Sequence, residues 1–348
     1  MVGRDARRRR RRERGVIEAG VASARDGAGR ARRGVVLSGA GGSWRVRVLD
    51  DASHVEASLR GRLKRDSSGE RAPRQGPGDR LKLAVGDEVL VEPDARGGAW
   101  AICEILPRRS RLARRAPGGA YGERIVAANI DQVVVVFAAA RPEPHPRMLD
   151  RFLVIAEANA LAARIIVNKV DLVTERDARE RFAAYERAGY PLHFTSAKRG
   201  DGLAQVRVML EGRVSVLTGP SGVGKSSLLN TLFPGLALRV GEISASVNKG
   251  RHTTVGATMI PLPNDATGFV VDTPGLREVG MWALSVEHLD TCFPELRPFL
   301  AECRFADCTH TVEPGCAVRE AVTRGDISGK RFESYLKLRS ELEEANFQ

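Results

Sequence analysis

The stretch Val214–Asn230, which reads VSVLTGPSGVGKSSLLN, decides the fold of this chain. A short run of aliphatic and β-branched residues leads into a glycine-containing turn, and an apolar-periodic helix is expected to begin at Lys225. The turn fits the pattern G-x-x-x-x-G-K-[ST], in which backbone N–H groups surround a phosphate at the N-terminus of a helix. The stretch therefore predicts a phosphate-binding loop between a buried strand and a helix.

Each residue type in this loop has a chemical reason. Glycines let the backbone fold closely around a phosphate, a lysine neutralises the β- and γ-phosphate oxygens, and a hydroxyl binds Mg²⁺. We expect Lys225 to act on the phosphates during catalysis and Ser226 to bind magnesium. The predicted nucleotide contacts of the loop are Gly219, Pro220, Ser221, Gly222, Val223, Gly224, Lys225, Ser226 and Ser227.

Composition describes a globular protein with a basic extension. The chain has 348 residues, 43% hydrophobic residues and a net charge of +12, and it has no apolar run long enough to span a bilayer. Residues 1–33 contain 12 arginines and 4 acidic residues, so much of the excess charge lies in this segment. We expect a disordered tail that either contacts an anionic polymer or is simply solvated.

A series of short strands follows the tail. We expect strands at Val35–Leu37, Trp44–Leu49, His54–Leu59, Lys82–Val85, Val89–Val91 and Trp100–Leu106. Regular short strands of this kind favour a small all-β barrel, plausibly an oligonucleotide-binding (OB) fold. Its turn-rich segment 60–82 carries 8 basic and 3 acidic residues, which suits an RNA backbone or, alternatively, a solvated loop. Either tryptophan could stack on a base, but a place in the core is favoured for each.

The pattern then changes to strands that alternate with helices. Ile130–Phe137 is a continuous apolar run, Arg147–Ala163 has helical periodicity, and a second strand at Arg164–Val167 ends in the motif Asn168-Lys-Val-Asp171. Such alternation predicts a doubly wound α/β domain with its site at the carboxyl edge of the sheet.

The N-K-x-D motif has a chemistry of its own. A carboxylate at Asp171 would accept hydrogen bonds from the ring N–H and amine of guanine, which adenine does not offer, so it selects GTP over ATP. Asn168 would tie the base site to the phosphate loop, and Lys169 would cover the base. Ser196 and Ala197 follow another strand and would offer backbone N–H groups to the guanine oxygen.

The motif Asp272-Thr-Pro-Gly275 comes after the phosphate loop, at the end of an apolar strand. Asp272 would hold Mg²⁺ through water, and the Gly275 N–H would contact the γ-phosphate. A magnesium-binding threonine belongs between these motifs, where we expect Thr254, with the adjacent Thr253 as the alternative.

These are the motifs of a GTPase in rotated order, because N-K-x-D precedes the phosphate loop, and the chain therefore resembles a circularly permuted GTPase. The segment after Gly275, which moves when the γ-phosphate leaves, then runs directly into the C-terminal region. That region contains the pattern C-x4-C-x-H-x5-C. Its thiolates and imidazole predict a closed structural zinc site with the ligands Cys303, Cys308, His310 and Cys316. Cys103 and Cys292 lie outside this spacing and are expected to be small apolar fillers.

The chain resembles the ribosome small-subunit-dependent GTPase A family (RsgA, also called YjeQ), because it combines the barrel, the permuted motifs and the cysteine pattern. The resemblance implies a multidomain protein: a tail over 1–33, an OB-like RNA-binding barrel over 34–110, a permuted GTPase domain over 111–284 and a small helical zinc-binding domain over 285–348. It further implies a cytoplasmic, monomeric assembly factor without a membrane partner.

According to this resemblance, the protein binds the small ribosomal subunit and its rRNA, hydrolyses GTP to GDP when the subunit stimulates it, and is then released. Its ligands would be GTP or GDP, Mg²⁺ and one structural Zn²⁺. In this family a histidine of the G-[RQ]-H-T-T segment is proposed to assist hydrolysis, which here is His252. Leu276 follows D-x-x-G where many GTPases have a catalytic glutamine, and leucine cannot orient water.

Two alternatives differ in function. One is a nucleotide-gated RNA-binding scaffold with negligible hydrolysis, and the other is a permuted GTPase of large-subunit assembly. The barrel and the C-terminal cysteines argue against the second. An ATPase or kinase is disfavoured by Asn168 and Asp171.

Overall fold

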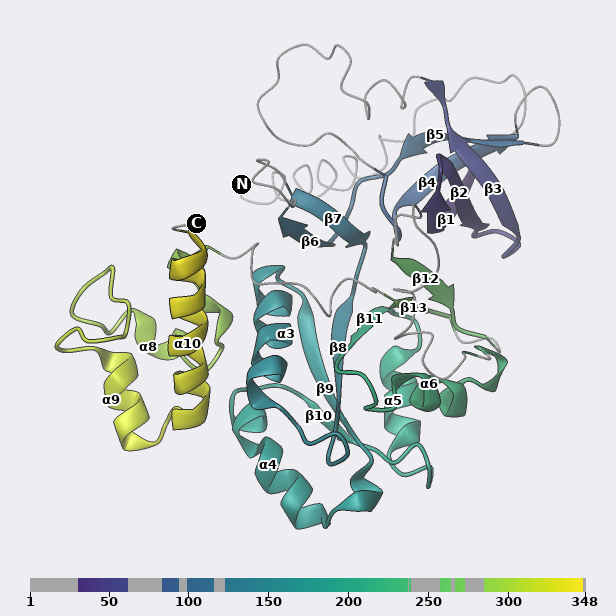
Figure 1. Ribbon diagram of the computed structural model, residues 1–348. Coiled ribbons are helices and arrows are strands. Elements are labelled where there is room, and N and C mark those ends of the chain that lie inside the picture. Colours follow the sequence, from purple (N-terminus) through teal and green to yellow (C-terminus); the bar gives the residue numbers. More distant parts are fainter. Residues whose placement is uncertain are drawn as a thin grey trace, which may run out of the picture.

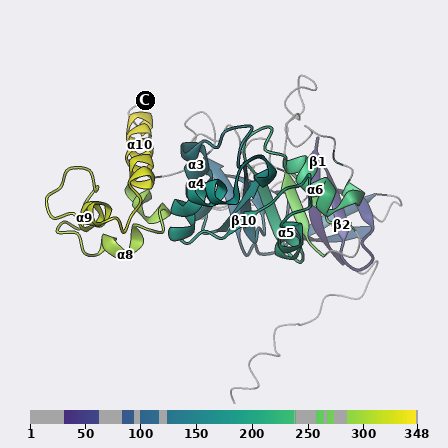
Figure 2. The same cartoon turned by 90° about the horizontal axis from the view of Figure 1, so that it is seen from below.

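The computed structural model describes residues 31–61, 83–93, 99–115, 123–236, 238, 257–263, 267–272 and 285–346. Three parts follow one another along the chain: a β-barrel, a sheet with helices on both faces, and a helical C-terminal region (Figure 1). In Figure 2 the C-terminal helices and the barrel lie at opposite ends, with the helix-covered sheet between them. Among the helices of the described residues, none has the length and apolar character that crossing a bilayer requires.

The barrel is closed and has the strand order β1-β2-β3-β5-β4. Small aliphatic side chains at alternating positions fill it, including Val36, Val46, Val91 and Ile102. Trp44 and Trp100 pack against this core, in agreement with the favoured interpretation of both residues. The strands are β1 (Arg32–Ala40), β2 (Ser43–Val48), β3 (His54–Leu59), β4 (Glu88–Pro93) and β5 (Trp100–Ile105).

Two details of the barrel differ from expectation. The predicted strand at 82–85 is wrong for its described part, because Leu83 and Ala84 lie outside any strand and Val85 forms only an isolated bridge to Ala127. Strand β1 begins at Arg32, so Arg32 and Arg33 of the predicted tail pair with β4. The rest of the tail, residues 1–30, and most of the basic segment, residues 62–82, lie outside the described residues.

A two-stranded sheet of β6 (Arg111–Arg115) and β7 (Glu123–Ala128) leads from the barrel to the central sheet. The central sheet has the order β10-β9-β8-β11-β13-β12, and only the edge strand β12 runs antiparallel. Its strands are β8 (Gln132–Ala138), β9 (Ala162–Asn168), β10 (Leu192–Phe194), β11 (Val214–Thr218), β12 (Thr258–Pro261) and β13 (Phe269–Asp272).

Helices cover both faces of this sheet, as the alternating pattern predicts (Figure 1). On one face lie α3 (Pro146–Ala158) and α4 (Glu175–Arg187), and on the other lie α5 (Leu203–Leu210) and α6 (Lys225–Leu232). Helix α3 ends five residues before the predicted Ala163, because Asn159 caps it and Ala160 turns the chain with a φ of 52°. Strand β9 therefore begins at Ala162.

The C-terminal region is built from short helices around its own core. Leu289, Phe293, Leu296 and Tyr335 are buried in that core, and Val154 of α3 joins them from the central domain. The elements are η4 (Val286–His288), η5 (Asp290–Cys292), α8 (Arg297–Leu300), α9 (Ala317–Arg324) and α10 (Gly329–Asn346). Helices α3 and α10 lie side by side in both views (Figures 1 and 2).

Candidate functional site

The loop between β11 and α6 is shaped by two glycines with left-handed backbone. Gly219 has a φ of 134°, and a side chain there would overlap the carbonyl oxygen of Val136. Gly224 has a φ of 95°, and a Cβ there would lie 2.6 Å from Nδ2 of Asn168. Any larger residue at these two positions would push β8 or β9 away from the loop. The glycines therefore let the loop approach both neighbouring strands.

Lys225 is buried at the start of α6, although a lysine normally reaches water. Its Nζ donates to the carbonyl oxygens of Gly219 at 2.8 Å and of Pro220 at 2.7 Å. The ammonium group is thereby held over the loop in which a phosphate would lie. Ser226 follows in the first turn of α6 and is also buried.

Asn168, at the end of β9, joins the two halves of the site. Its Nδ2 donates to the carbonyl oxygen of Val223 in the loop at 2.9 Å. Its Oδ1 accepts from Thr195 Oγ1 at 3.2 Å and from the Ala197 N–H at 3.2 Å. Asn168 is 1% exposed, so these partners satisfy a buried amide. The predicted base motif thus contacts the predicted phosphate loop.

Asp171 and Ser196 are paired beside this amide. Ser196 Oγ donates to Asp171 Oδ1 at 2.6 Å and accepts from the Arg199 N–H at 3.1 Å. The hydrogen bond from Ser196 is the main reason that the pKa of Asp171 lies below its usual value. A carboxylate kept ionised in this way can accept two N–H groups.

Lys169 holds its backbone in the left-handed region with a φ of 62°. Its Nζ donates to the carbonyl oxygen of Gly222 at 2.6 Å and also to that of Arg141. The side chain therefore lies across the space between the phosphate loop and the segment after β8. Its predicted place over the base stays a prediction.

Asp272 ends β13, which pairs in parallel with β11 so that Asp272 lies beside Leu217. Its backbone is therefore at the same edge of the sheet as the phosphate loop. Four predicted site residues lie outside the described residues: His252, Thr253, Thr254 and Gly275.

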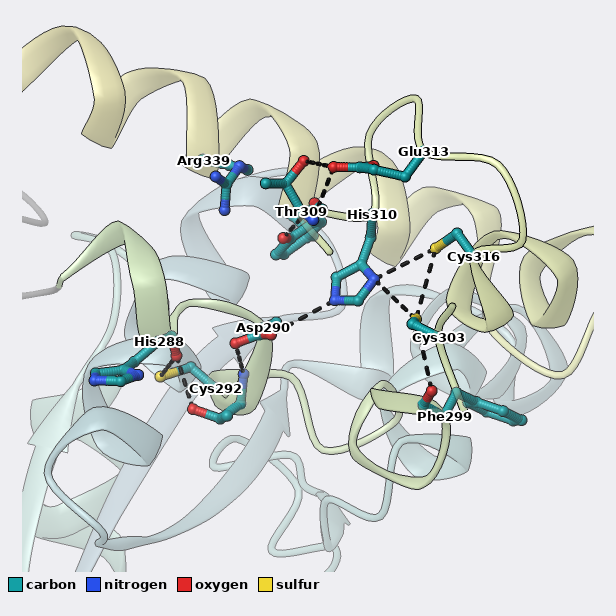
Figure 3. Close-up of polar contacts among 12 residues, drawn as sticks. His288, Asp290, Cys292, Phe299, Cys303, Thr309, His310, Glu313, Cys316 and Arg339 are labelled. Carbon is teal, nitrogen blue, oxygen red and sulfur yellow. Dashed lines mark hydrogen bonds and ion pairs between the residues drawn. The ribbon is translucent and has the colours of Figure 1, made fainter. Parts of the chain in front are cut away.

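The predicted metal ligands come together in the C-terminal region, and Figure 3 labels three of them, Cys303, His310 and Cys316. One ligand atom from each of Cys303, Cys308, His310 and Cys316 lies within 4.8 Å of all the others. His310 Nδ1 lies 3.6 Å from Cys303 Sγ and 3.4 Å from Cys316 Sγ. A cluster of three thiols and one imidazole of this size has the donor set of a structural zinc site.

The other ring nitrogen of His310 points away from the thiols. Its Nε2 approaches Asp290 Oδ2 at 3.5 Å, which is longer than a standard hydrogen bond (Figure 3). Carboxylates commonly orient metal-binding histidines in this way. His310 Nδ1 is thus the ring nitrogen that faces the thiols.

Glu313 fixes the loop that carries His310. Its carboxylate accepts from the backbone N–H groups of Thr309 and Thr311, both at 2.9 Å, and from the Thr309 hydroxyl. Burial opposes ionisation of Glu313, but these hydrogen bonds outweigh it and lower its pKa to about 2. Tyr335 Oη in α10 donates to the carbonyl oxygen of Thr309 at 2.9 Å, which ties the loop to α10.

The remaining cysteines lie elsewhere, as predicted. Cys103 is in the barrel strand β5, and its thiol donates to the carbonyl oxygen of Leu90 at 3.2 Å. Cys292 is buried in the C-terminal core, where burial raises its pKa to about 11. A thiol with so high a pKa is a poor nucleophile at neutral pH.

Sequence reasoning missed three residues that support these sites. Thr195 positions Asn168, and its place directly before Ser196 was an available signal. Asp290 and Glu313 support His310, but no local pattern connects Asp290 with a histidine twenty positions later.

A phosphate loop joined to an N-K-x-D motif that precedes it in the chain defines the class: a circularly permuted GTPase. The comparisons with known proteins identify the family. Residues 105–282 match the family model described as RsgA GTPase. The chain belongs to the RsgA GTPase family, and it is a GTPase that hydrolyses GTP.

Two relatives and two solved structures illustrate the likeness. A protein of Gemmatimonas aurantiaca, named small ribosomal subunit biogenesis GTPase RsgA, is 59% identical over 89% of this chain and 97% of its own length. A protein of that name from Bacteroides fragilis is 37% identical over 90% of this chain and 98% of its own length.

The crystal structure of YjeQ from Thermotoga maritima has a TM-score of 0.71 and 34% identity, covering 90% of this chain and 99% of that one. The structure of YloQ, a circularly permuted GTPase, has a TM-score of 0.67 and 25% identity. The match covers 93% of this chain and 99% of that one. The predicted fold class, an OB-like barrel, a permuted GTPase and a C-terminal cysteine–histidine domain, is confirmed.

Proposed function

We propose that this GTPase acts in late maturation of the small ribosomal subunit and leaves the subunit after it hydrolyses GTP. The names of the relatives support this proposal, because this chain aligns with 97% and 98% of the length of those two proteins. The observation that carries its GTP-binding part is the hydrogen bond from Asn168 to Val223, which unites a guanine-selective motif with a phosphate loop.

In this proposal water attacks the γ-phosphorus of GTP, and the bond to the β-phosphate oxygen breaks to give GDP and phosphate. Asp171 accepts the ring N–H and amine of guanine, Lys169 covers the base, and the Ala197 N–H contacts the guanine oxygen. Residues 219–227 surround the phosphates, and Lys225 neutralises the developing charge. Lys225 then exchanges its present carbonyl partners for phosphate oxygens.

Ser226, Thr254 and Asp272 are the proposed magnesium ligands, directly or through water. Magnesium would neutralise charge on the β- and γ-phosphates. Gly275 would contact the γ-phosphate, and His252 would assist the attacking water. These last roles follow from the motifs alone.

For the C-terminal cluster we propose one structural zinc ion held by Cys303, Cys308, Cys316 and Nδ1 of His310. The residues fit such an ion, because all four donors lie within 4.8 Å of one another and Asp290 faces the other ring nitrogen. A closed set of four protein ligands supplies folding free energy and leaves no open position for chemistry.

The barrel and the basic segments are the proposed contacts with rRNA, since the chain carries a net charge of +12. We further propose a monomer in the cytoplasm, without a membrane partner. The division of the chain into domains that begin at residues 34, 111 and 285 is also a proposal. It is supported by apolar clusters centred in the barrel, in the central domain and in the C-terminal region, although Val35 and Leu37 of β1 belong to the central cluster and Val154 of α3 belongs to the C-terminal one.

The test is GTP turnover with and without purified small ribosomal subunits. We expect slow release of phosphate by the protein alone and a rise of at least tenfold with small subunits, but not with large ones. Lys225→Ala should abolish stimulated turnover. The matched control, Lys337→Ala in α10, removes an exposed lysine and should leave it unchanged.

Two outcomes would overturn the proposal in different ways. Nucleotide-dependent binding to small subunits without stimulated release of phosphate would support the scaffold with negligible hydrolysis. Stimulation by large subunits instead of small ones would indicate that the protein acts in assembly of the large subunit.

A further inference from the structure

Arg331 of α10 is buried at the boundary between the C-terminal region and the central domain. Its side chain is 2% exposed, which is rare for an arginine. Helix α10 lies beside α3, so the guanidinium group has neighbours from both parts of the chain.

Two carboxylates neutralise this buried charge. Nη1 of Arg331 donates to Asp150 Oδ1 at 2.5 Å, while Nε and Nη2 donate to the two oxygens of Glu295 at 2.6 and 3.1 Å. Asp150 belongs to α3 of the central domain and is 1% exposed. Glu295 belongs to the C-terminal region itself. One charge therefore has one partner on each side of the boundary.

Aromatic rings from both sides complete the pocket. The guanidinium carbon lies 4.7 Å from the ring centre of Phe293 in the C-terminal region. It lies 5.2 and 5.8 Å from the rings of Tyr185 and Tyr190 in the central domain. Cations near such ring faces are stabilised when water is excluded.

Two other ion pairs cross this boundary among the described residues, and both are more exposed than the pairs of Arg331. Arg151 of α3 pairs with Glu341 of α10, but the two side chains are 39% and 48% exposed. Arg297 pairs with Glu157 at 2.6 Å; Arg297 is 47% exposed and Glu157 is 15% exposed. Exposed pairs contribute little, whereas removal of one partner from a buried pair is costly.

We propose that the contact between Asp150 and Arg331 fixes the position of the metal-binding region on α3. The bidentate pair with Glu295 keeps the charge of Arg331 satisfied within its own region. Loss of Asp150 should therefore leave that region folded but freer to move, because the contacts that remain across the boundary are mainly packing, such as that of Val154, and the two more exposed ion pairs. Asp150 and Arg331 are positioning residues in this sense.

The experiment measures the distance between the two parts in the full, zinc-loaded chain. Spin labels are introduced as non-natural amino acids at Glu180 of α4 and Glu320 of α9, which are both exposed, so the metal-binding cysteines stay intact. Pulsed electron spin resonance then gives the distance distribution. The variants are Asp150→Ala, Asp150→Asn and the matched control Glu341→Gln. Zinc content and binding of GDP are measured for each.

The parent and Glu341→Gln should give one narrow distribution. Asp150→Ala should raise the population of displaced distances about tenfold or more. Asp150→Asn should have a smaller effect, because its amide oxygen still accepts a hydrogen bond. All variants should keep one zinc ion and bind GDP.

A narrow, unshifted distribution for Asp150→Ala would overturn the proposal. Loss of zinc from Asp150→Asn would also overturn it, since Asp150 would then be needed for the fold of the C-terminal region and not for its position. A broadened distance distribution for Glu341→Gln would mean that the exposed pair of Arg151 and Glu341 fixes the position of the C-terminal region instead.

Discussion

Asn168 and Val223 are 55 positions apart in the chain, yet Asn168 Nδ2 donates to the carbonyl oxygen of Val223 at 2.9 Å. In this permuted GTPase the base motif comes before the phosphate loop in the chain, and each follows a different strand of the central sheet, β9 or β11. This hydrogen bond joins the two motifs, and Gly224 leaves the space for it. The next two predictions concern the residues around this amide.

Replacement Asp171→Asn should change base selectivity. The amide would present a donor to the guanine ring N–H, so the affinity for GDP should fall about 100-fold or more while that for XDP rises. Fluorescence titration with labelled GDP and XDP measures both affinities. Asp177→Asn on exposed α4 is the matched control, with unchanged affinities. If the Asp171 variant still prefers guanine as strongly as the parent protein, the base does not bind at Asp171.

Thr195→Val should weaken nucleotide binding, although we expect no direct contact between residue 195 and the nucleotide. Asn168 Oδ1 would lose one of its two described donors, at a cost of about 1 kcal/mol, so the affinity for GDP should fall about fivefold. The same titration measures the effect. Thr323→Val on exposed α9 should change nothing. Equal affinities for both variants would contradict the role assigned to Thr195.

The sequence predicted what depends on local pattern. The phosphate loop, Asn168-Lys-Val-Asp171 and the four metal ligands could be found because each motif places several chemical groups at a fixed spacing. The structure brings the described members of these motifs together. Their assignment to particular ligands stays a prediction.

What depends on packing could not be found in this way. The end of α3 at Ala158 follows from a left-handed turn at Ala160, which helical periodicity does not indicate. Val85 looked like a barrel residue because it is apolar, but it pairs with Ala127 outside the barrel. Asp290 and Asp150 act through partners that only the packing of the C-terminal helices supplies.

Cys308→Ala should release the proposed zinc. Elemental analysis should show loss of about one equivalent, and hydrogen exchange in α9 and α10 should accelerate because metal binding stabilises such small domains. Cys103→Ala in the barrel is the matched control and should keep its zinc. If the Cys308 variant also retains one equivalent, the ligand assignment is wrong.

Asp290→Asn should weaken zinc binding without abolishing it. The residue lies behind His310 and is not a ligand, so a drop of about 10- to 100-fold in zinc affinity is expected. Competition with a chromogenic chelator gives the affinity. Asp326→Asn, which alters an exposed carboxylate paired with Arg324, should have no effect. Complete loss of zinc from the Asp290 variant would instead make Asp290 part of the metal site's fold.

Zinc affinity should also rise with pH. Burial raises the pKa of the Cys308 and Cys316 thiols above the usual value, so both are protonated near neutral pH when no metal is bound. Zinc binds thiolates, and each binding event must therefore displace these protons. Each thiol proton displaced adds a factor of ten per pH unit, so these two thiols alone should raise the apparent association constant at least about 100-fold between pH 6 and 7. Calorimetry in buffers of different ionisation enthalpy should count about two or more protons released per zinc ion, and release of fewer than one would mean that the thiols are already ionised.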